Sequence, residues 1–177
     1  MPTVVNAKTF TYADIDFLPD GNYEIIDGER RDMAPTGFEH GYLEGIFCEL
    51  LKNHFRDKGY VASGEVGILI RKEPLRLRAA DVVYIGKDKS PGKLRGILTL
   101  APDLIVEIVS ESNTLWEMND KVKDYLSIAV GRIVIVDPQT ETLTVYQHGK
   151  RECLIFNFSE EFELAEGLKV KLNDLLR

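Results

Sequence analysis

An apolar run with a single acid inside it, Pro102–Ser110, constrains the fold more than any other stretch of this chain. Residues 104–106, 108 and 109 form a continuous aliphatic run, as in a strand whose sheet is covered on both faces. Glu107 stands in the middle of this run. A buried ionised carboxylate costs several kcal/mol unless it is paired, metal-bound or protonated. The sequence therefore predicts a central strand in which Glu107 faces a specific partner.

Length and composition predict one domain, residues 1–177, with an ordinary buried core. The chain has 177 residues, of which 44% are hydrophobic and 29% charged. Its net charge of −7 argues against binding nucleic acid through a general positive field, although it allows a local basic groove. No run approaches the length of a membrane span and no signal pattern opens the chain, so we expect a cytoplasmic protein without membrane contact. Cys48 and Cys153 lack metal-ligand spacing and are expected to be reduced, structural thiols.

Two long helices and several strands are predicted. One helix covers 36–56 after a capping box at Thr36–Glu39, and the other runs from a second box at Thr114–Glu117 to about Ser127. A short helix at 11–18 precedes a hairpin at 23–31 with an Asp-Gly turn. Strand-like segments follow at 60–66, 67–72, 75–85, 104–109, 132–136, 142–147 and 152–158, with a closing segment at 168–176. This order predicts one α/β or α+β domain with a mixed sheet.

Asp81, Glu107 and Lys121 are the residues on which a function can be built. The two acids lie on predicted strands, and neighbouring strands are about 5 Å apart, so both carboxylates could share a hard cation. Helical periodicity places Lys121 beside the apolar face of its helix, whereas Lys123 points to solvent. A lysine there could stabilise charge that develops on a phosphate. Two alternatives stay open: Asp81 as an acceptor for loop hydrogen bonds, and Lys121 as an i, i+4 partner of Glu117.

The residues around these three resemble a known family. The chain resembles a bacterial family of restriction-endonuclease-like proteins, long catalogued as a domain of unknown function and expanded in cyanobacteria, within the PD-(D/E)xK nuclease superfamily. The motif-bearing core is about 23–137 and the resemblance reaches Leu176. The motifs that carry it are Tyr23–Glu29 ("YELIDGE"), Met33–Pro35 with His40 ("M-s-P…H"), Arg78–Val83 ("R-x-PD-v-v"), Pro102–Ser110 ("PdLvvEvlS"), Glu117 with Lys121 and Tyr125 ("D…K…Y"), and Gly131–Pro138.

This resemblance implies both a fold and an activity. The fold is a restriction-endonuclease-like mixed β-sheet core flanked by helices, with additional β-hairpins. The activity is metal-dependent endonucleolytic hydrolysis of DNA, with Mg²⁺ or Mn²⁺ held by Asp81, Glu107 and the backbone carbonyl of Ile108. The family pattern lacks a lysine two residues after the glutamate, where Val109 stands, so Lys121 takes the catalytic role. A homodimer is also implied, and Phe156 and Phe158 are candidate apolar contacts.

Three departures from the family pattern leave the proposed site intact. Ala80 replaces the motif proline, which sets backbone shape and carries no chemistry. Glu117 replaces an aspartate and lengthens an arm beside the lysine. Val134 or Ile135 stands where the last motif has an aromatic residue, which we interpret as a packing change.

Four further residues are candidates for a supporting or substrate-contacting role: His40, Glu24, Glu117 and Arg78. His40 is either a core histidine or an orienting or phosphate-contacting group, and Glu117 is either a helix cap or a partner of the lysine. Glu24 and, more weakly, Glu44 could add carboxylates or face solvent. The basic run of Arg71, Lys72, Arg76 and Arg78 is either a phosphate-contacting rim or a solvated strand face.

Two rival functions use the same fold without catalysis. One is a catalytically inactive nuclease-fold module that binds nucleic acid or a protein partner. The other is an antitoxin-like interaction partner, although nothing in the chain looks like a partner-binding tail. Binding of Mn²⁺ that depends on Asp81 would favour the nuclease over both.

Overall fold

The computed structural model describes residues 9–90 and 92–176. Its helices are the long α1 (Phe38–Phe55) and α2 (Leu115–Ser127) and the short 3-10 turns η1 (Tyr12–Phe17), η2 (Arg56–Lys58) and η3 (Leu172–Asp174). Its strands are β1 (Tyr23–Ile26), β2 (Glu29–Asp32), β3 (Gly59–Arg71), β4 (Arg76–Gly86), β5 (Leu104–Ile108), β6 (Arg132–Asp137), β7 (Thr142–Gln147), β8 (Leu154–Asn157), β9 (Glu161–Ala165) and β10 (Leu168–Lys171).

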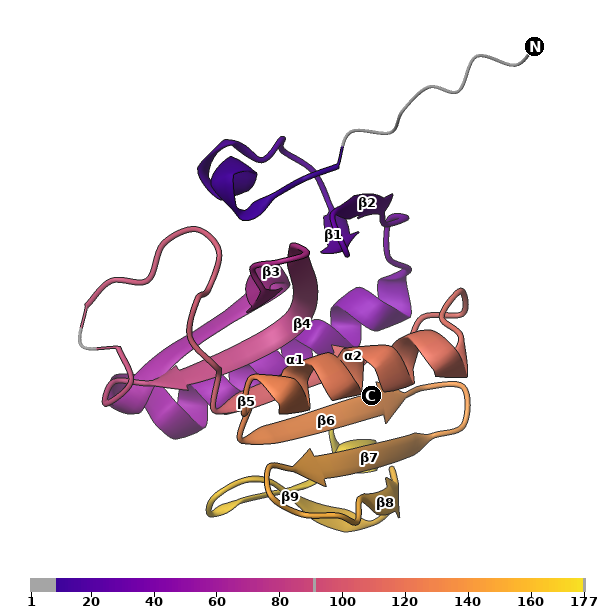
Figure 1. Ribbon diagram of the computed structural model, residues 1–177. Helices are drawn as coiled ribbons and strands as arrows, with labels where there is room; N and C mark the ends of the chain where they lie inside the picture. The colour runs from indigo at the N-terminus through magenta and orange to yellow at the C-terminus, as the bar shows by residue number, and fades with distance from the viewer. Residues whose placement is uncertain (1–8, 91, 177) are drawn as a thin grey trace.

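One eight-stranded mixed sheet organises the molecule. Seven strands follow the order β2-β1-β4-β5-β6-β7-β8, and β3 pairs with β4 beside this path. The β5–β6 pair is parallel, the other pairs are antiparallel, and β9 and β10 form a small separate sheet. The long helices lie on opposite sides of the sheet, with α2 in front and α1 behind in Figure 1. The predicted mixed α+β fold with flanking helices and β-hairpins is confirmed.

Alternate residues of β5 face the two helices, as its uninterrupted aliphatic run requires. Val106 packs in the cluster that contains Leu43 and Phe47 of α1. Ile105 packs in the opposite cluster, with Met118 of α2. All five residues of β5 are buried. By this alternation Glu107 faces α2.

Local signals predicted the hairpin and the start of α2 correctly. Asp27 and Gly28 both have positive φ, 55° and 86°, as a two-residue type I′ turn demands. Thr114 and Glu117 form the expected reciprocal capping box. The other predicted box is wrong. The N-cap of α1 is Gly37 and not Thr36, the helix begins at Phe38, and no side chain caps it. Thr36 is therefore one position too early to cap it.

The prediction of two strands at 60–66 and 67–72 is also wrong, because β3 is one strand with a bulge. Its pairing with β4 shifts register between Ser63 and Val66, so Gly64 and Glu65 together oppose Asp81. At the predicted break between 66 and 67 the pairing continues without a shift, since Val66 pairs with Ala80 and Gly67 with Ala79.

The C-terminal part differs from expectation in two ways. Strand β9 was not predicted, and it pairs with β10. Phe158 is buried and Phe156 packs on the same cluster, so neither is the exposed dimer contact that we expected. Leu154 and Ile155 are the exposed hydrophobic residues of β8 instead. The homodimer stays a prediction, which equilibrium sedimentation would measure.

Two smaller expectations concern the thiols and the membrane. Cys48 is buried, Cys153 is exposed, and neither forms a disulfide. Among the helices of residues 9–90 and 92–176, none is both long and apolar enough to cross a bilayer.

Candidate active site

The strands separate at Asp81, and this opening creates the candidate site. The β4–β5 pairing ends at Val82 opposite Val106. Asp81 is the neighbour of Val82 on β4. Its carboxylate accepts a hydrogen bond from the Ile108 N–H of β5 (2.7 Å to Oδ2). On the other side of Asp81 lies the β3 bulge. Bulges occur beside active sites because they redirect a side chain without ending the strand.

Glu107 is paired with two side chains of α2. Lys121 Nζ lies 2.8 Å from Oε2, and the Tyr125 hydroxyl donates to Oε1 at 2.5 Å. Only 2% of Glu107 is exposed, and this burial raises its pKa to about 7 against the opposing effect of Lys121. The partner required by the apolar run of β5 is therefore the amine of Lys121.

Lys121 is held as a partly buried cation. Its Nζ also donates to the Ala79 carbonyl (3.1 Å) and lies 3.4 Å from Glu24 Oε1. Burial lowers the pKa of Lys121, but the carboxylates of Glu107 and Glu24 outweigh it, and the net shift is upward. Lys121 thus keeps its proton, and Lys123 is exposed as expected.

His40 extends the cluster on the α1 side of Asp81. Its Nε2 lies 3.2 Å from Asp81 Oδ1, and the residue is 9% exposed. Neither ring nitrogen has a well-aligned hydrogen-bond acceptor among the described residues. The pKa of His40 is nevertheless raised, first by its hydrogen-bonding contact with Asp81 and then by the charge of that carboxylate, which together outweigh the lowering effect of burial. His40 was predicted to be either a core histidine or an orienting group of the site. The structure places it beside the acids of the site.

Glu65 belongs to this cluster and was missed in the sequence. It sits on the bulge with φ 58°, and its Oε2 is buried without a hydrogen-bond partner in the described part of the chain. Burial, and then the charge of Asp81, raise its pKa to about 6. Gly64 inside a strand pattern was the available signal, since such a glycine indicates a bulge. Glu44 is close as well: burial and Asp81 raise its pKa.

Arg78 supports the site from inside the protein. It is 5% exposed and pairs with Glu24 (2.7 Å), Asp124 (2.5 Å) and Asp120. Arg76 is also buried and pairs with the same two aspartates of α2. The prediction of an exposed phosphate-contacting or solvated run is therefore wrong for both arginines. Their guanidinium groups instead attach α2, and with it Lys121, to β4.

The remaining predicted residues have ordinary local partners. Glu117 accepts hydrogen bonds from the Thr114 N–H and hydroxyl, so it caps α2 and does not pair with Lys121. Arg71 pairs with Asp27, and Lys72 lies 4.6 Å from the centre of the Tyr12 ring. The structure thus brings together Asp81, Glu107, Lys121, His40 and Glu24, and leaves Glu117 outside.

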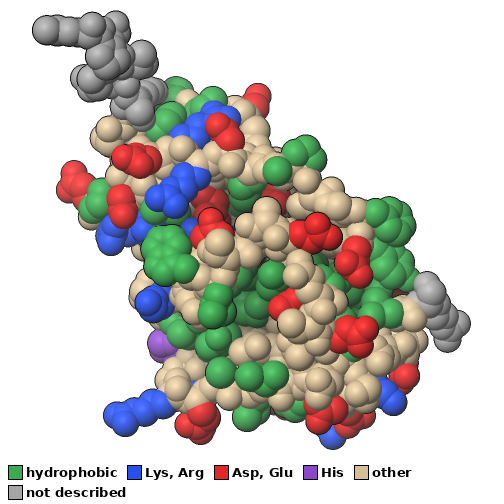
Figure 2. Space-filling view, turned by 90° about the vertical axis from the view of Figure 1, so that its right-hand side faces the viewer, with side chains coloured by type: hydrophobic (Ala, Val, Ile, Leu, Met, Phe, Trp, Pro, Cys, Tyr) green, Lys and Arg blue, Asp and Glu red, His purple; other side chains and the backbone are tan. Residues whose placement is uncertain are grey.

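The face of the molecule at which α1 and α2 begin is rich in acids. Figure 2 shows this face, with several acidic side chains around its centre and with Lys and Arg mostly toward its margins. A phosphate could approach such a surface only with a cation to offset the repulsion.

The donors fit a hard divalent cation in chemistry, but they are not assembled as a ligand set. Asp81, Glu107 and Glu65 offer the carboxylate oxygens that Mg²⁺ and Mn²⁺ prefer. In the described residues, no three His, Cys, Asp or Glu side chains are placed to hold a metal together. Both oxygens of Glu107 are instead used by Lys121 and Tyr125.

The raised pKa of Glu107 predicts an unusual pH dependence of stability in the metal-free protein. The folded pKa is about 7 and the unfolded value about 4.5, so the folded chain binds more protons between these pH values. The free energy of unfolding should therefore fall as the pH rises from about 4.5 to about 7, by on the order of 3 kcal/mol. Urea unfolding in a chelator at both ends of this window measures the fall.

Glu107→Gln should remove the part of the fall that Glu107 contributes, because the amide does not titrate, and should leave the smaller part that comes from the raised pKa of Glu65. Glu111→Gln, at an exposed position, should keep it. An equal fall in the Glu107→Gln variant would assign the effect to other groups.

Comparison with known proteins places the chain in a family. The model of the family Uma2, described as "Putative restriction endonuclease", matches residues 11–175. The chain belongs to this family. The resemblance noted from the sequence motifs is thereby confirmed, and the Uma2 match supports a nuclease-like function.

A solved structure shows the same fold. The crystal structure of a "putative nuclease belonging to DUF820" from Anabaena variabilis superposes with a TM-score of 0.81 at 16% identity. The match covers 94% of this chain and 97% of the other. At that identity the likeness establishes the fold alone. No curated protein matches the sequence.

Proposed function

We propose that this Uma2 protein is a metal-dependent nuclease that hydrolyses phosphodiester bonds in DNA. One observation carries the proposal: the partly buried ammonium of Lys121 lies against Glu107, beside the point where the strands open at Asp81. Metal-assisted phosphate hydrolysis needs carboxylates to hold the ion and a positive charge near the phosphate. An acid on each of two adjacent strands, with a lysine next to them, supplies these groups. The family match supports the same reaction class.

Asp81, Glu107 and the carbonyl of Ile108 are the groups that would hold Mg²⁺ or Mn²⁺. When bound, the ion would polarise the scissile phosphate and lower the pKa of an attacking water. The oxygen donors fit this role in their chemistry, and Glu65 offers a further carboxylate oxygen without a partner among the described residues.

Side chains of the protein supply a fixed positive charge and hold the groups around it in place. Lys121 keeps its proton and can stabilise the negative charge that develops on the phosphate. The Tyr125 hydroxyl orients Glu107 through its hydrogen bond. Glu24 joins Arg78 to Lys121 and so links the amine to the buried arginine.

A second candidate function is a catalytically inactive nuclease-fold module that binds nucleic acid or a protein partner. It is favoured by the engagement of both Glu107 oxygens with α2, and by the absence of a ready group of three metal ligands in the part of the chain described. Such a module needs the fold but not the ion.

Calorimetric titration with Mn²⁺ separates these two functions. The wild-type protein should bind Mn²⁺, and Asp81→Asn should weaken binding at least about tenfold, because the amide loses the charge that the ion requires. Asp57→Asn, an exposed position, is the matched control and should bind as wild type does. Absence of wild-type binding at millimolar Mn²⁺ would contradict the nuclease and favour the module.

A further inference from the structure

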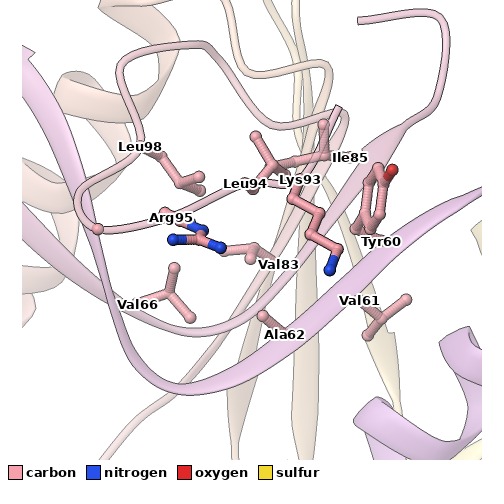
Figure 3. A pocket seen from close by; sticks show the side chains of 11 residues that line it. Tyr60, Val61, Ala62, Val66, Val83, Ile85, Lys93, Leu94, Arg95 and Leu98 are labelled. Atoms are coloured by element: carbon pink, nitrogen blue, oxygen red, sulfur yellow. The ribbon is translucent and has the colours of Figure 1, made fainter. Parts of the chain in front are cut away.

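A cavity of about 390 Å³ lies between β3, β4 and the segment at 93–98. Figure 3 shows its walls, which are aliphatic side chains with the Tyr60 ring at one end. Lys93 and Arg95 also line it and bring its positive charge. This volume is within the range of sites that enclose a small organic group.

The segment at 93–98, which forms one wall of the cavity, is joined to β3 by backbone hydrogen bonds. The Leu69 N–H donates to the Leu98 carbonyl, and the Leu98 N–H donates to the Gly67 carbonyl, each at 2.8 Å. Gly67 allows this approach, since a Cβ there would lie 3.2 Å from Ile97 Cγ1. The cavity is therefore formed before any ligand binds.

The cavity adjoins the candidate active site. Val83 lines it and is two residues from Asp81 on β4, about 7 Å along a strand. Ala62 and Val66 line it from either side of the bulge that carries Glu65. Val83 packs in the same cluster as Met118 and Tyr125 of α2, so this wall of the cavity lies on the side of the sheet where Glu107 contacts Lys121.

Among the residues that the structure describes, the two cations of the cavity form no ion pair, unlike those of the site. Lys93 and Arg95 form no ion pair within residues 9–90 and 92–176, whereas Arg78 and Lys121 are paired with acids. The chain has a net charge of −7, so Lys93 and Arg95 form a local positive region that attracts phosphate beside the acidic site. Apolar walls, one aromatic ring and free cations together match a nucleotide: a flat base and an anionic backbone.

We infer that this cavity receives one unpaired base of the substrate strand, while Lys93 and Arg95 contact the adjoining phosphates. The inference rests on the proposed nuclease function and narrows its substrate to single-stranded or locally unpaired DNA. A base inside a duplex must first be unpaired and leave the stack before it can enter such a cavity, and this costs free energy that a single strand does not lose.

The test measures binding of labelled DNA to the full chain in a chelator, by fluorescence anisotropy. The probes are an oligothymidylate, a strand of equal length whose sugars carry no bases, and a duplex of equal length. The oligothymidylate should bind at least about tenfold more tightly than either of the others, because only it can place a base in the cavity.

Two variants separate the base from the phosphates. Ala62→Phe fills the cavity from an exposed position and should weaken oligothymidylate binding about tenfold without affecting the baseless strand. The double variant Lys93→Ala/Arg95→Ala should weaken the binding of both single strands and lower the salt slope by about 1.4, since each phosphate contact on a single strand contributes about 0.7. Lys150→Ala/Arg151→Ala changes the same charges at exposed positions outside the cavity and should behave as wild type.

Equal binding of the oligothymidylate and the baseless strand, or tighter binding of the duplex, would overturn the inference. Unchanged oligothymidylate binding by both cavity variants would do the same. Cleavage with Mg²⁺ is assayed separately, so the two proposals can fail independently. If the oligothymidylate binds as expected but is not cleaved, the nuclease proposal is contradicted and the cavity assignment stands. If DNA is cleaved but single strands bind no better than duplex, the cavity assignment is contradicted and the nuclease proposal stands.

Discussion

Lys121→Met should reduce Mg²⁺-dependent DNA cleavage by about 10²- to 10³-fold. The substitution removes the positive charge next to Glu107 and keeps a side chain of similar length. Initial rates on single-stranded and plasmid DNA measure the loss. Lys123→Met, two residues along the same helix and exposed, should cleave as wild type does. A Lys121→Met protein with undiminished rates would remove the amine from the mechanism.

The variant should remain folded, and the reason lies in Glu107. Without the amine, burial raises the pKa of Glu107 further, and the carboxyl can become neutral by taking a proton. The Tyr125 hydroxyl remains as its hydrogen-bond partner. Thermal unfolding of the Lys121→Met protein therefore distinguishes loss of catalysis from loss of structure.

Glu107→Gln should lower the rate as severely as Lys121→Met if the two side chains act together. The double variant should then be no worse than either single variant, because groups that act as a unit give non-additive losses. Multiplied effects in the double variant would show that the acid and the amine contribute independently.

Arg78→Met should destabilise the fold by about 3–5 kcal/mol, the largest effect on stability that we expect. It leaves buried Glu24 and the partly buried Asp120 and Asp124 close together with fewer positive charges. Urea unfolding measures the loss, and Arg151→Met, at an exposed position, should change stability little. A loss of less than about 1 kcal/mol would mean that Arg76 alone holds the aspartates.

Arg78→Lys tests whether shape as well as charge matters. The guanidinium donates to Glu24, Asp120 and Asp124 in three directions from one plane, which an ammonium cannot reproduce. We expect a stability between those of wild type and Arg78→Met. Recovery of full stability would show that charge alone is needed.

The features that depend on one helix, strand or turn at a time were predictable from the order of the residues alone. The aliphatic run around Glu107 predicted a strand covered on both faces and a partner for its acid, and the periodicity of α2 selected Lys121 over Lys123. The Asp27–Gly28 turn and the Thr114 capping box were equally local, because each depends on a few neighbouring residues.

The directions in which the side chains of β4 point depend instead on how the strands pair in the folded protein. All eleven residues of β4 are buried, so no polar alternation marks its two faces. Arg78 and Ala80 face α2, but Val82 faces α1, and the alternation breaks at Asp81. The cause is the register shift against β3, which also brings Glu65 into the cluster. Register is a property of two paired strands, so neither strand's sequence alone contains it.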